Sequence, residues 1–187
     1  IAGHGTSPKD LLKTNPEDWK KSVKDAYLDL KQKTDKIFII GNSFGSNLGL
    51  WLTKEFNNAP SGIISLSAPI YLKYHKFILS RIYTYGWFRR YYRKPRRVYR
   101  NPFAFVRSLF HKKNQVVKNA EFLGKSDYDV IPVKSFKEFL RFIKRETMPN
   151  LEKIKAPIFI VHSETDPVVL PKSAEYIYKN IASEKKH

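Results

Sequence analysis

The sequence predicts an α/β protein with a mostly parallel sheet flanked by helices. Three short apolar runs without polar alternation are typical of strands buried on both faces of a parallel sheet, and they lie at 36–40, 62–66 and 158–161. Between the first two runs a helix is expected over residues 46–57, because Leu48, Trp51, Leu52 and Phe56 recur at helical spacing. A strand, a helix and a strand in this order predict a right-handed crossover.

A further helix is expected over residues 15–33. Its apolar residues share one face at helical spacing; they are Trp19, Val23, Ala26, Tyr27 and Leu30. Asn15 suits the N-cap and Pro16 the first turn, and the carboxylates of Glu17 and Asp18 suit the positive end of the helix dipole.

Length and composition limit the classes of protein to which this chain can belong. A chain of 187 residues with 42% hydrophobic content can form one ordinary core. No run approaches the roughly 18–20 apolar residues of a membrane span, and the absence of cysteine excludes disulfides and thiolate metal sites. We expect a cytoplasmic location, although the chain opens on Ile1 rather than Met, so a signal upstream of Ile1 stays open.

The positive charge is confined to one segment. The chain carries a net charge of +18, and residues 70–150 hold 20 Lys and Arg against 5 Asp and Glu. This segment also contains 18 of the 27 aromatic residues, and it interrupts the pattern of buried strands. We therefore expect one discontinuous core domain at 1–69 and 151–187, with 70–150 as a basic, mostly helical cap inserted between two strands.

The pentapeptide GNSFG, residues 41–45, joins the first strand to the next helix. The carboxyl ends of parallel strands face the crevice where ligands bind, so a serine on this sharp turn projects its hydroxyl into that crevice. Crowding in such a turn favours residues without a Cβ, which Gly41 and Gly45 supply. The sequence thus predicts Ser43 as a nucleophile; the alternative is a glycine-rich turn whose serine caps the helix.

A serine nucleophile needs a histidine base and a carboxylate that orients it. Asp166 follows the strand at 158–161 by a few residues, which predicts that it emerges at the same sheet edge as Ser43. Its place after the nucleophile in the chain favours it as the acid. Glu164 lies close by, and either acid has the alternative role of capping the helix that follows Pro171.

Together these stretches resemble the α/β-hydrolase superfamily, in particular small bacterial carboxylesterases and monoacylglycerol lipases. The matching stretches are Gly3-His4-Gly5, NPEDW, the Gly41–Gly45 elbow, SAPIY at 67–71, APIFIVHSETDPVV and SAEYIYKNI. The resemblance implies a serine hydrolase that cleaves esters with an apolar acyl group through an acyl-enzyme. It implies Ser43 as nucleophile, Asp166 as acid, the Phe44 N–H as one oxyanion donor, and no metal or organic cofactor.

None of the five histidines is predicted to complete the triad. His187 lies 21 positions after Asp166, and a helix at 172–182 carries the chain back to the opposite sheet edge, so His187 is expected near the start of a further strand. His162 ends a buried strand, His75 and His111 lie in the basic insertion, and His4 belongs to a glycine turn. We therefore expect this chain to be a fragment without the first strands and the last strand, and to be inactive as it stands.

The basic insertion has several possible roles. As a cap, its apolar inner face would line an acyl pocket, and its cationic outer face suits an anionic lipid surface or solvent. Arginine and tyrosine interleaved over 86–100 are also compatible with nucleic-acid binding, which is disfavoured because no recognition motif accompanies the charge. A non-catalytic protein with the hydrolase fold is the third alternative. The oligomeric state is not predicted.

Overall fold

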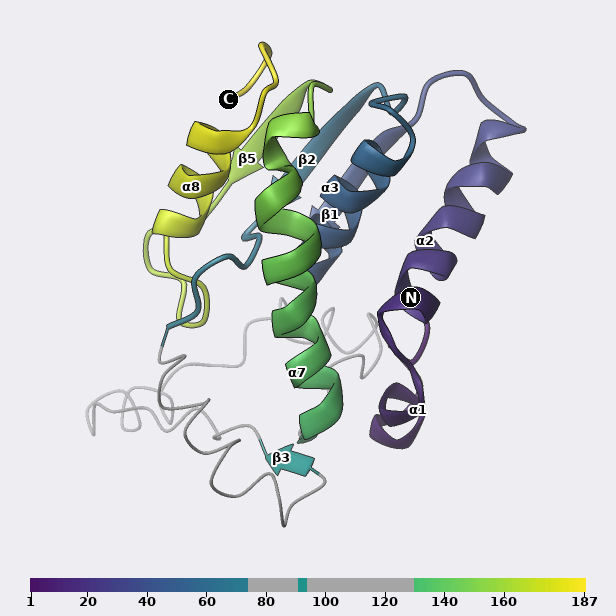
Figure 1. Ribbon diagram of the computed structural model, residues 1–187, viewed down its shortest axis with the longest axis vertical. Helices are drawn as coiled ribbons and strands as arrows, with labels where there is room; N and C mark the ends of the chain where they lie inside the picture. Colours follow the sequence, from purple (N-terminus) through teal and green to yellow (C-terminus); the bar gives the residue numbers. More distant parts are fainter. Residues whose placement is uncertain (74–90, 94–129) are drawn as a thin grey trace, which may run out of the picture.

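The computed structural model describes residues 1–73, 91–93 and 130–187. Its main sheet has three parallel strands in the order β1, β2, β5, with β2 in the centre (Figure 1). These strands are β1 (Phe38–Asn42), β2 (Gly62–Leu66) and β5 (Ile158–Val161). The second and third strands lie where the sequence predicts them, whereas β1 begins and ends two residues later than expected and includes Gly41.

The register of the sheet aligns the ends of the three strands. Asn42 pairs with Leu66, which in turn pairs with Val161. Because all three strands are parallel, the turns that follow Asn42, Leu66 and Val161 leave the sheet at one carboxyl edge. The predicted nucleophile and acid belong to two of these turns.

The N-terminal helices are α1 (Pro8–Lys13) and α2 (Pro16–Lys31). The prediction of a capped helix is confirmed: the Asn15 side chain accepts the Asp18 N–H, and the Asp18 side chain accepts the Asn15 N–H. Trp19 and Tyr27 are buried as their spacing suggests. Leu30 is instead 47% exposed, because it lies in the last turn of α2.

Helix α3 (Phe44–Glu55) begins two residues earlier than predicted, directly after Ser43. Its residues Leu48, Trp51 and Leu52 are buried. They pack with Trp19 and Tyr27 of α2 into one hydrophobic cluster. A second cluster, around Leu50, Ile63, Leu151, Ile158 and Ile177, joins α3 to the sheet and to the C-terminal part of the chain.

The described end of the insertion is α7 (Val133–Phe142), which continues through the π-helix η1 (Ile143–Thr147) into the 3₁₀-helix η2 (Met148–Lys153). A short antiparallel pair, β3 (Tyr91–Arg93) and β4 (Val130–Pro132), precedes α7. Helix α8 (Lys172–Asn180) follows β5. The predicted helical cap over 74–90 and 94–129, and most of the basic segment 86–100, lie outside the described residues.

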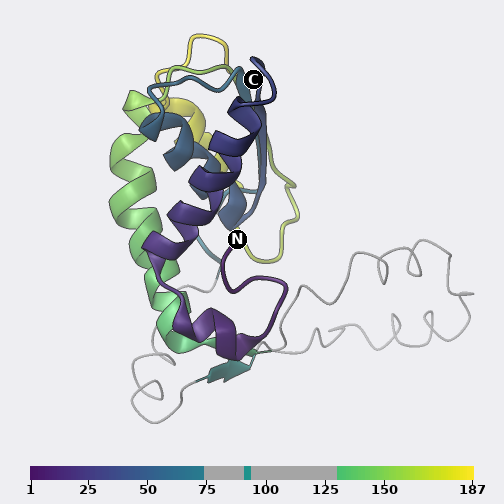
Figure 2. The ribbon, with the colours of Figure 1, turned by 90° about the vertical axis from the view of Figure 1, so that its right-hand side faces the viewer.

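The sheet is covered on one face. Figure 2 shows α2, α3 and α7 on the same side of the strands. On the other face Phe38 and Ile40 of β1 are 64% and 67% exposed, and Phe159 and Val161 of β5 are 52% and 39% exposed. The prediction that these strands are buried on both faces is therefore wrong for the described part of the chain, because no described helix packs on this second face.

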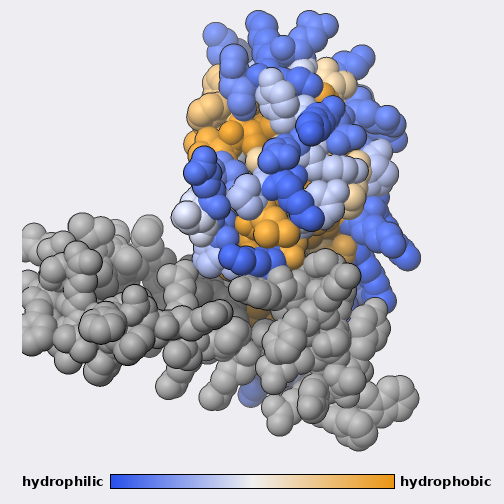
Figure 3. Space-filling view, turned by 90° about the vertical axis from the view of Figure 1, so that its left-hand side faces the viewer, coloured by the Kyte–Doolittle hydropathy of each residue, from blue (hydrophilic) through white to orange (hydrophobic). Residues whose placement is uncertain are grey.

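The surface carries patches of apolar side chains. Figure 3 views the molecule from the side of α8 and shows such patches bordered by hydrophilic side chains. Among the described residues, no helix combines the length and the apolar character that crossing a membrane requires.

Candidate active site

Ser43 stands at the turn between β1 and α3, and its backbone has an unusual conformation. Its φ and ψ are 52° and −123°, a combination that a residue with a Cβ rarely adopts. The Ser43 N–H donates to the Leu66 carbonyl at 2.8 Å, and the Ser43 carbonyl accepts the Ser46 N–H at 2.9 Å. These bonds hold the strained turn at the end of β1 and β2, and the Ser43 residue itself is exposed.

The structure gives the two elbow glycines different roles. A Cβ built on Gly41 would lie 2.5 Å from the Cα and the N of Ser46, which is closer than real Cβ atoms approach backbone. A Cβ on Gly45 would meet no described atom within 4 Å. The predicted crowding therefore applies to Gly41, where α3 crosses the end of β1, and not to Gly45.

The alternative interpretation of Ser43, as a helix-capping serine, does not fit this geometry. Ser43 occupies the N-cap position of α3, but its side chain makes no capping hydrogen bond. A capping serine normally has an extended backbone and accepts an N–H of the first turn. Ser43 has neither feature, so its hydroxyl is left available at the sheet edge.

Phe44 begins α3 and is fixed by an aromatic cluster. Its ring makes edge-to-face contacts with the rings of Trp19, Phe139 and Phe142, at centroid distances of 5.3, 5.2 and 5.2 Å. Such pairs contribute about 0.5–1.5 kcal/mol each beyond their buried area. The Phe44 N–H lies at the N-terminus of α3, where free amides and the helix dipole favour developing negative charge.

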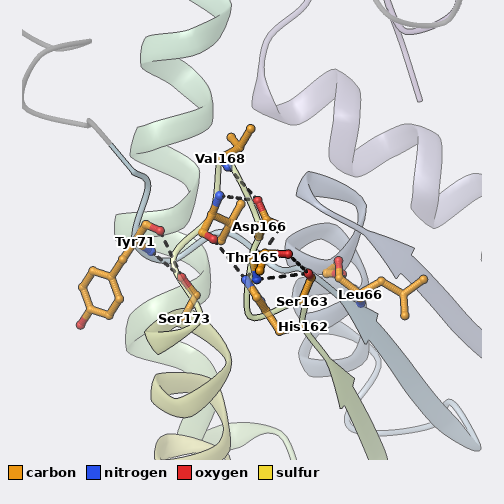
Figure 4. A network of polar contacts seen from close by, with 10 residues as sticks. Leu66, Tyr71, His162, Ser163, Thr165, Asp166, Val168 and Ser173 are labelled. Atoms are coloured by element: carbon orange, nitrogen blue, oxygen red, sulfur yellow. Dashed lines mark hydrogen bonds and ion pairs between the residues drawn. The ribbon is translucent and has the colours of Figure 1, made fainter. Parts of the chain in front are cut away.

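Asp166 lies in the loop after β5, and one oxygen of its carboxylate organises that loop (Figure 4). Its Oδ1 accepts the N–H groups of Val168 and Val169, both at 2.8 Å. The alternative role, capping the helix after Pro171, is not observed, because these two amides precede α8 and Pro171 has no side-chain cap. Glu164 is exposed.

The environment of Asp166 favours its charged form. Burial alone would raise the pKa of the carboxyl, but the amides of Val169 and Val168, a hydrogen bond with the Ser67 side chain and the nearby His162 outweigh it, so the pKa is lowered. Hydrogen bonds to a carboxylate stabilise the anion in this way. Asp166 is therefore ionised at neutral pH, as an acid that orients an imidazole must be.

The end of β2 connects the two predicted residues. Leu66 accepts the Ser43 N–H, and the next residue, Ser67, donates its own N–H to the Val161 carbonyl at 2.8 Å, with its side chain near enough to Asp166 to lower the pKa of that carboxyl. Ser43 and Asp166 consequently leave the sheet at the same carboxyl edge, on the two sides of the central strand.

Three histidines lie within the described residues, and one of them, His162, lies beside Asp166. The Nε2 of His162 is 3.2 Å from the Val169 carbonyl and 3.9 Å from Asp166 Oδ2, with the side chain only 5% exposed. His187 pairs with the first half of β5 through bonds to Ile158 and Ile160, which is where a further strand was expected to start. The Nδ1 of His4 is 3.2 Å from the Ala2 carbonyl within the glycine turn.

Two serines near the site, Ser46 and Ser67, were not predicted from the sequence. The Ser67 side chain helps to lower the pKa of Asp166, and Ser46, fully buried in the first turn of α3, hydrogen-bonds Gly41 and Leu66. Their roles depend on the register between β1, β2 and β5, which single-sequence patterns do not contain. A signal was present only for Ser46, a polar residue directly after the elbow in a helix whose apolar residues share one face.

One open cavity of about 440 Å³ lies on the described surface away from these residues. Neither Ser43 nor Asp166 lines it. Its walls come from the segment after β2, from α7, η1 and η2, and from α8: Ile70, Leu140, Ile143, Lys144, Met148, Pro149 and Tyr176.

Comparisons with known proteins agree with this fold. The model of the Hydrolase_4 family, described as serine aminopeptidase S33, matches residues 1–187. A carboxylesterase of Bacillus subtilis (strain 168) is 26% identical over 186 residues, which are 98% of this chain and 65% of that protein. A thermostable monoacylglycerol lipase of Bacillus sp. (strain H-257) is 28% identical over 186 residues, with 100% of this chain and 65% of that protein covered.

Among solved structures, one described with the metagenome-derived lipolytic enzymes LipS and LipT superposes with a TM-score of 0.76 at 22% identity, covering 100% of this chain and 67% of that one. The chain therefore spans about 65% of the length of the curated relatives it matches. A parallel sheet flanked by helices and a family match over the whole chain lead to one conclusion: this chain belongs to the S33 serine aminopeptidase family and has the α/β-hydrolase fold.

Proposed function

We propose that the full-length protein hydrolyses carboxylic esters through an acyl-enzyme, with Ser43 as nucleophile and Asp166 as the acid. The observation that carries the proposal is the turn at Ser43. A non-glycine residue with φ of 52° and ψ of −123°, exposed and without a capping bond, stands at the same carboxyl edge of the sheet as an ionised Asp166. Backbone strain of this kind, about 1–3 kcal/mol, is concentrated at active sites.

The proposed reaction has two steps. A histidine base takes the Ser43 hydroxyl proton while Oγ attacks the ester carbonyl carbon, and the same imidazole returns the proton to the departing alcohol. Water then attacks the acyl-enzyme with the same base, which releases the carboxylic acid and restores Ser43. The histidine is not assigned to His4 or His187, which lie in the glycine turn and alongside β5. It is not assigned to His162 either, whose Nε2 is 3.2 Å from the Val169 carbonyl and beyond hydrogen-bond distance of Asp166.

Asp166 suits the role of orienting that imidazole. Its Oδ1 is occupied by the amides of Val168 and Val169, so Oδ2 is the oxygen left to accept an imidazole N–H. The Nε2 of His162 is 3.9 Å from the same Oδ2, beyond hydrogen-bond distance.

The negative oxygen that develops during the attack needs hydrogen-bond donors. The Phe44 N–H, at the start of α3 and next to Ser43, is the donor we propose. The rings of Trp19, Phe139 and Phe142 hold Phe44 in place, so this amide is oriented before the substrate binds. Removing one such donor in a comparable site costs about 10²–10³ in kcat.

The substrate class is proposed as esters with an apolar acyl group. Support comes from the relatives, whose names are carboxylesterase and monoacylglycerol lipase. The basic cap, with its possible contact to anionic lipid surfaces, stays a prediction because it lies outside the described residues. The same holds for nucleic-acid binding by 86–100, which no observation favours.

The test is hydrolysis of short-chain p-nitrophenyl esters by the full-length protein. We expect Ser43→Ala to abolish turnover and labelling by a fluorophosphonate, and Asp166→Asn to lower kcat by about 10⁴, as loss of the orienting acid does in other triads. Glu164→Gln is the control, since Glu164 is exposed in the same loop. Equal losses in Glu164→Gln and Asp166→Asn, or turnover that survives Ser43→Ala, would contradict the proposal.

A further inference from the structure

We propose that Ser46 is a positioning residue whose buried hydroxyl sets the place of the Ser43 nucleophile; this rests on the proposed function. Ser46 is 0% exposed. Its hydroxyl donates to the Gly41 carbonyl at 2.6 Å and accepts the Leu66 N–H at 3.1 Å, with the Leu66 carbonyl at 3.2 Å. One oxygen atom thereby joins α3, the end of β1 and the end of β2.

These partners are the groups that flank Ser43. Gly41 lies two residues before Ser43, and the Leu66 carbonyl accepts the Ser43 N–H at 2.8 Å. The Ser46 N–H donates in turn to the Ser43 carbonyl at 2.9 Å. Both backbone polar groups of Ser43 are therefore bonded either to Ser46 itself or to a residue that the Ser46 hydroxyl holds.

The strain at Ser43 makes this support necessary. A non-glycine residue at φ of 52° and ψ of −123° keeps that conformation only when its surroundings over-determine it. The Ser46 hydroxyl opposes relaxation of the turn, because a movement of Ser43 away from Leu66 would stretch the hydrogen bonds that this hydroxyl makes with Gly41 and Leu66. Ser46 is fully buried, so it acts through the backbone and does not touch the substrate.

The consequence for catalysis is a matter of geometry. Loss of the hydroxyl leaves the Leu66 N–H and the Gly41 carbonyl without this partner and lets the turn relax. A displacement of about 1 Å at reacting groups lowers the rate by about 10²-fold. We expect Ser46→Ala to lower kcat by about 10–100-fold, with KM changed by less than about 2-fold, because the hydroxyl is remote from bound substrate.

The matched control is Ser135→Ala. Ser135 is 3% exposed in α7, and its hydroxyl donates to the Leu11 carbonyl at 3.0 Å, so this variant also deletes a buried hydrogen bond. It differs from Ser46→Ala in having no contact with the turn at Ser43. Both variants are expected to lose comparable stability, about 1–3 kcal/mol, and only Ser46→Ala is expected to lose kcat.

The experiment measures kcat and KM for a p-nitrophenyl ester, the rate of labelling by a fluorophosphonate, and the melting temperature, on full-length wild type and both variants. Wild-type kcat in Ser46→Ala, or equal losses of kcat in the two variants, would overturn the inference. If Ser46→Ala does not fold, Ser46→Cys, which keeps the volume, replaces it under the same criterion. A wild type that neither turns over nor takes the label refutes the proposed function, and this inference with it.

Discussion

The two elbow glycines offer a sharp test of the structure, because Gly41→Ala and Gly45→Ala make the same change four residues apart. The new Cβ at position 41 would lie 2.5 Å from the backbone of Ser46 and 2.6 Å from the Gly45 carbonyl. Ordinary contact begins near 3.4 Å, so α3 must move away from β1 by about 0.9 Å. Backbone atoms cannot rotate aside, which places the cost at or above the upper end of the usual overpacking range of about 1–3 kcal/mol.

Two numbers follow for Gly41→Ala. A loss of about 3 kcal/mol lowers the melting temperature of a domain of this size by about 6–12 °C. A shift of nearly 1 Å at the nucleophile lowers its rate of labelling by a fluorophosphonate by about 10²-fold. Thermal unfolding followed by circular dichroism gives the first quantity, and the labelling rate measured well below the melting temperature gives the second.

Gly45→Ala is expected to behave oppositely in the unfolding assay. Its Cβ meets no described atom within 4 Å, and Gly45 lies in α3, where alanine is preferred to glycine by up to about 1 kcal/mol. The melting temperature should stay unchanged or rise. Equal destabilisation by the two substitutions, or a Gly41→Ala variant that melts within about 1 °C of wild type, would refute the close packing of α3 on β1.

Three further predictions concern single residues. Ser43→Gly should raise the free energy of unfolding, measured in urea, by about 1–3 kcal/mol while abolishing turnover, because glycine adopts φ of 52° without strain. The Asn58 side chain accepts the N–H groups of Lys155 and Ala156, so Asn58→Gly, which removes these bonds, should lower the free energy of unfolding by about 1–3 kcal/mol. Asn58 also has φ of 63°, so Asn58→Ala should cost about 1–2 kcal/mol more than Asn58→Gly. Equal losses in the two variants would contradict the predicted backbone strain. Because the pKa of Asp166 is lowered from its ordinary value of 3.8, its charged form stabilises the fold at pH values above 3.8, and this stability is lost as the pH falls through the pKa of the folded state. The difference in unfolding free energy between wild type and Asp166→Asn should therefore shrink at acid pH. A difference that does not depend on pH would contradict this expectation.

Local sequence signals predicted α2, α3 and the three strands of the main sheet to within two residues. Helix α2 has its cap, its first-turn carboxylates and its apolar stripe within 16 residues, so all the information that sets its start is local. The start of α3 was placed two residues too late, because the turn at Ser43 was expected to include residues that the structure puts in the helix. Only the structure shows how closely the start of α3 packs against the end of β1.

The exposed face of the sheet shows where the pattern misleads. Continuous apolar runs indicate a strand with two apolar faces. In β1, Phe38 and Ile40 lie on one face, whereas Ile39, together with Ile37 just before the strand, belongs to the packed residues of the other. The pattern predicts the chemistry of each face but not which element packs on it. The second face is therefore apolar, as predicted, and exposed among the described residues.

The candidate site was only half predictable for a related reason. Ser43 and Asp166 each follow an apolar run, a signal that a single segment carries. Ser46 depends partly on Leu66, 20 residues away on the neighbouring strand, and Ser67 influences Asp166 in the loop after β5, and no local pattern encodes these relationships. The glycine pattern was misleading in detail, because it predicts crowding at both Gly41 and Gly45. In the structure a Cβ at Gly41 would clash with the backbone of Ser46, whereas a Cβ at Gly45 would meet no described atom within 4 Å.

The conformation of Ser43 bears on whether this turn exists for folding or for chemistry. If the turn served folding alone, a glycine at position 43 would remove the strain, and a serine with an extended backbone would cap α3 for about 1 kcal/mol of benefit. The observed residue does neither: it keeps φ of 52° and makes no capping bond. The hydrogen bonds of the Ser43 backbone with the Leu66 carbonyl and the Ser46 N–H hold this strained conformation, which lowers the stability of the fold. What serine adds at this position, and glycine lacks, is an exposed hydroxyl at the sheet edge, which is the group that acyl transfer requires.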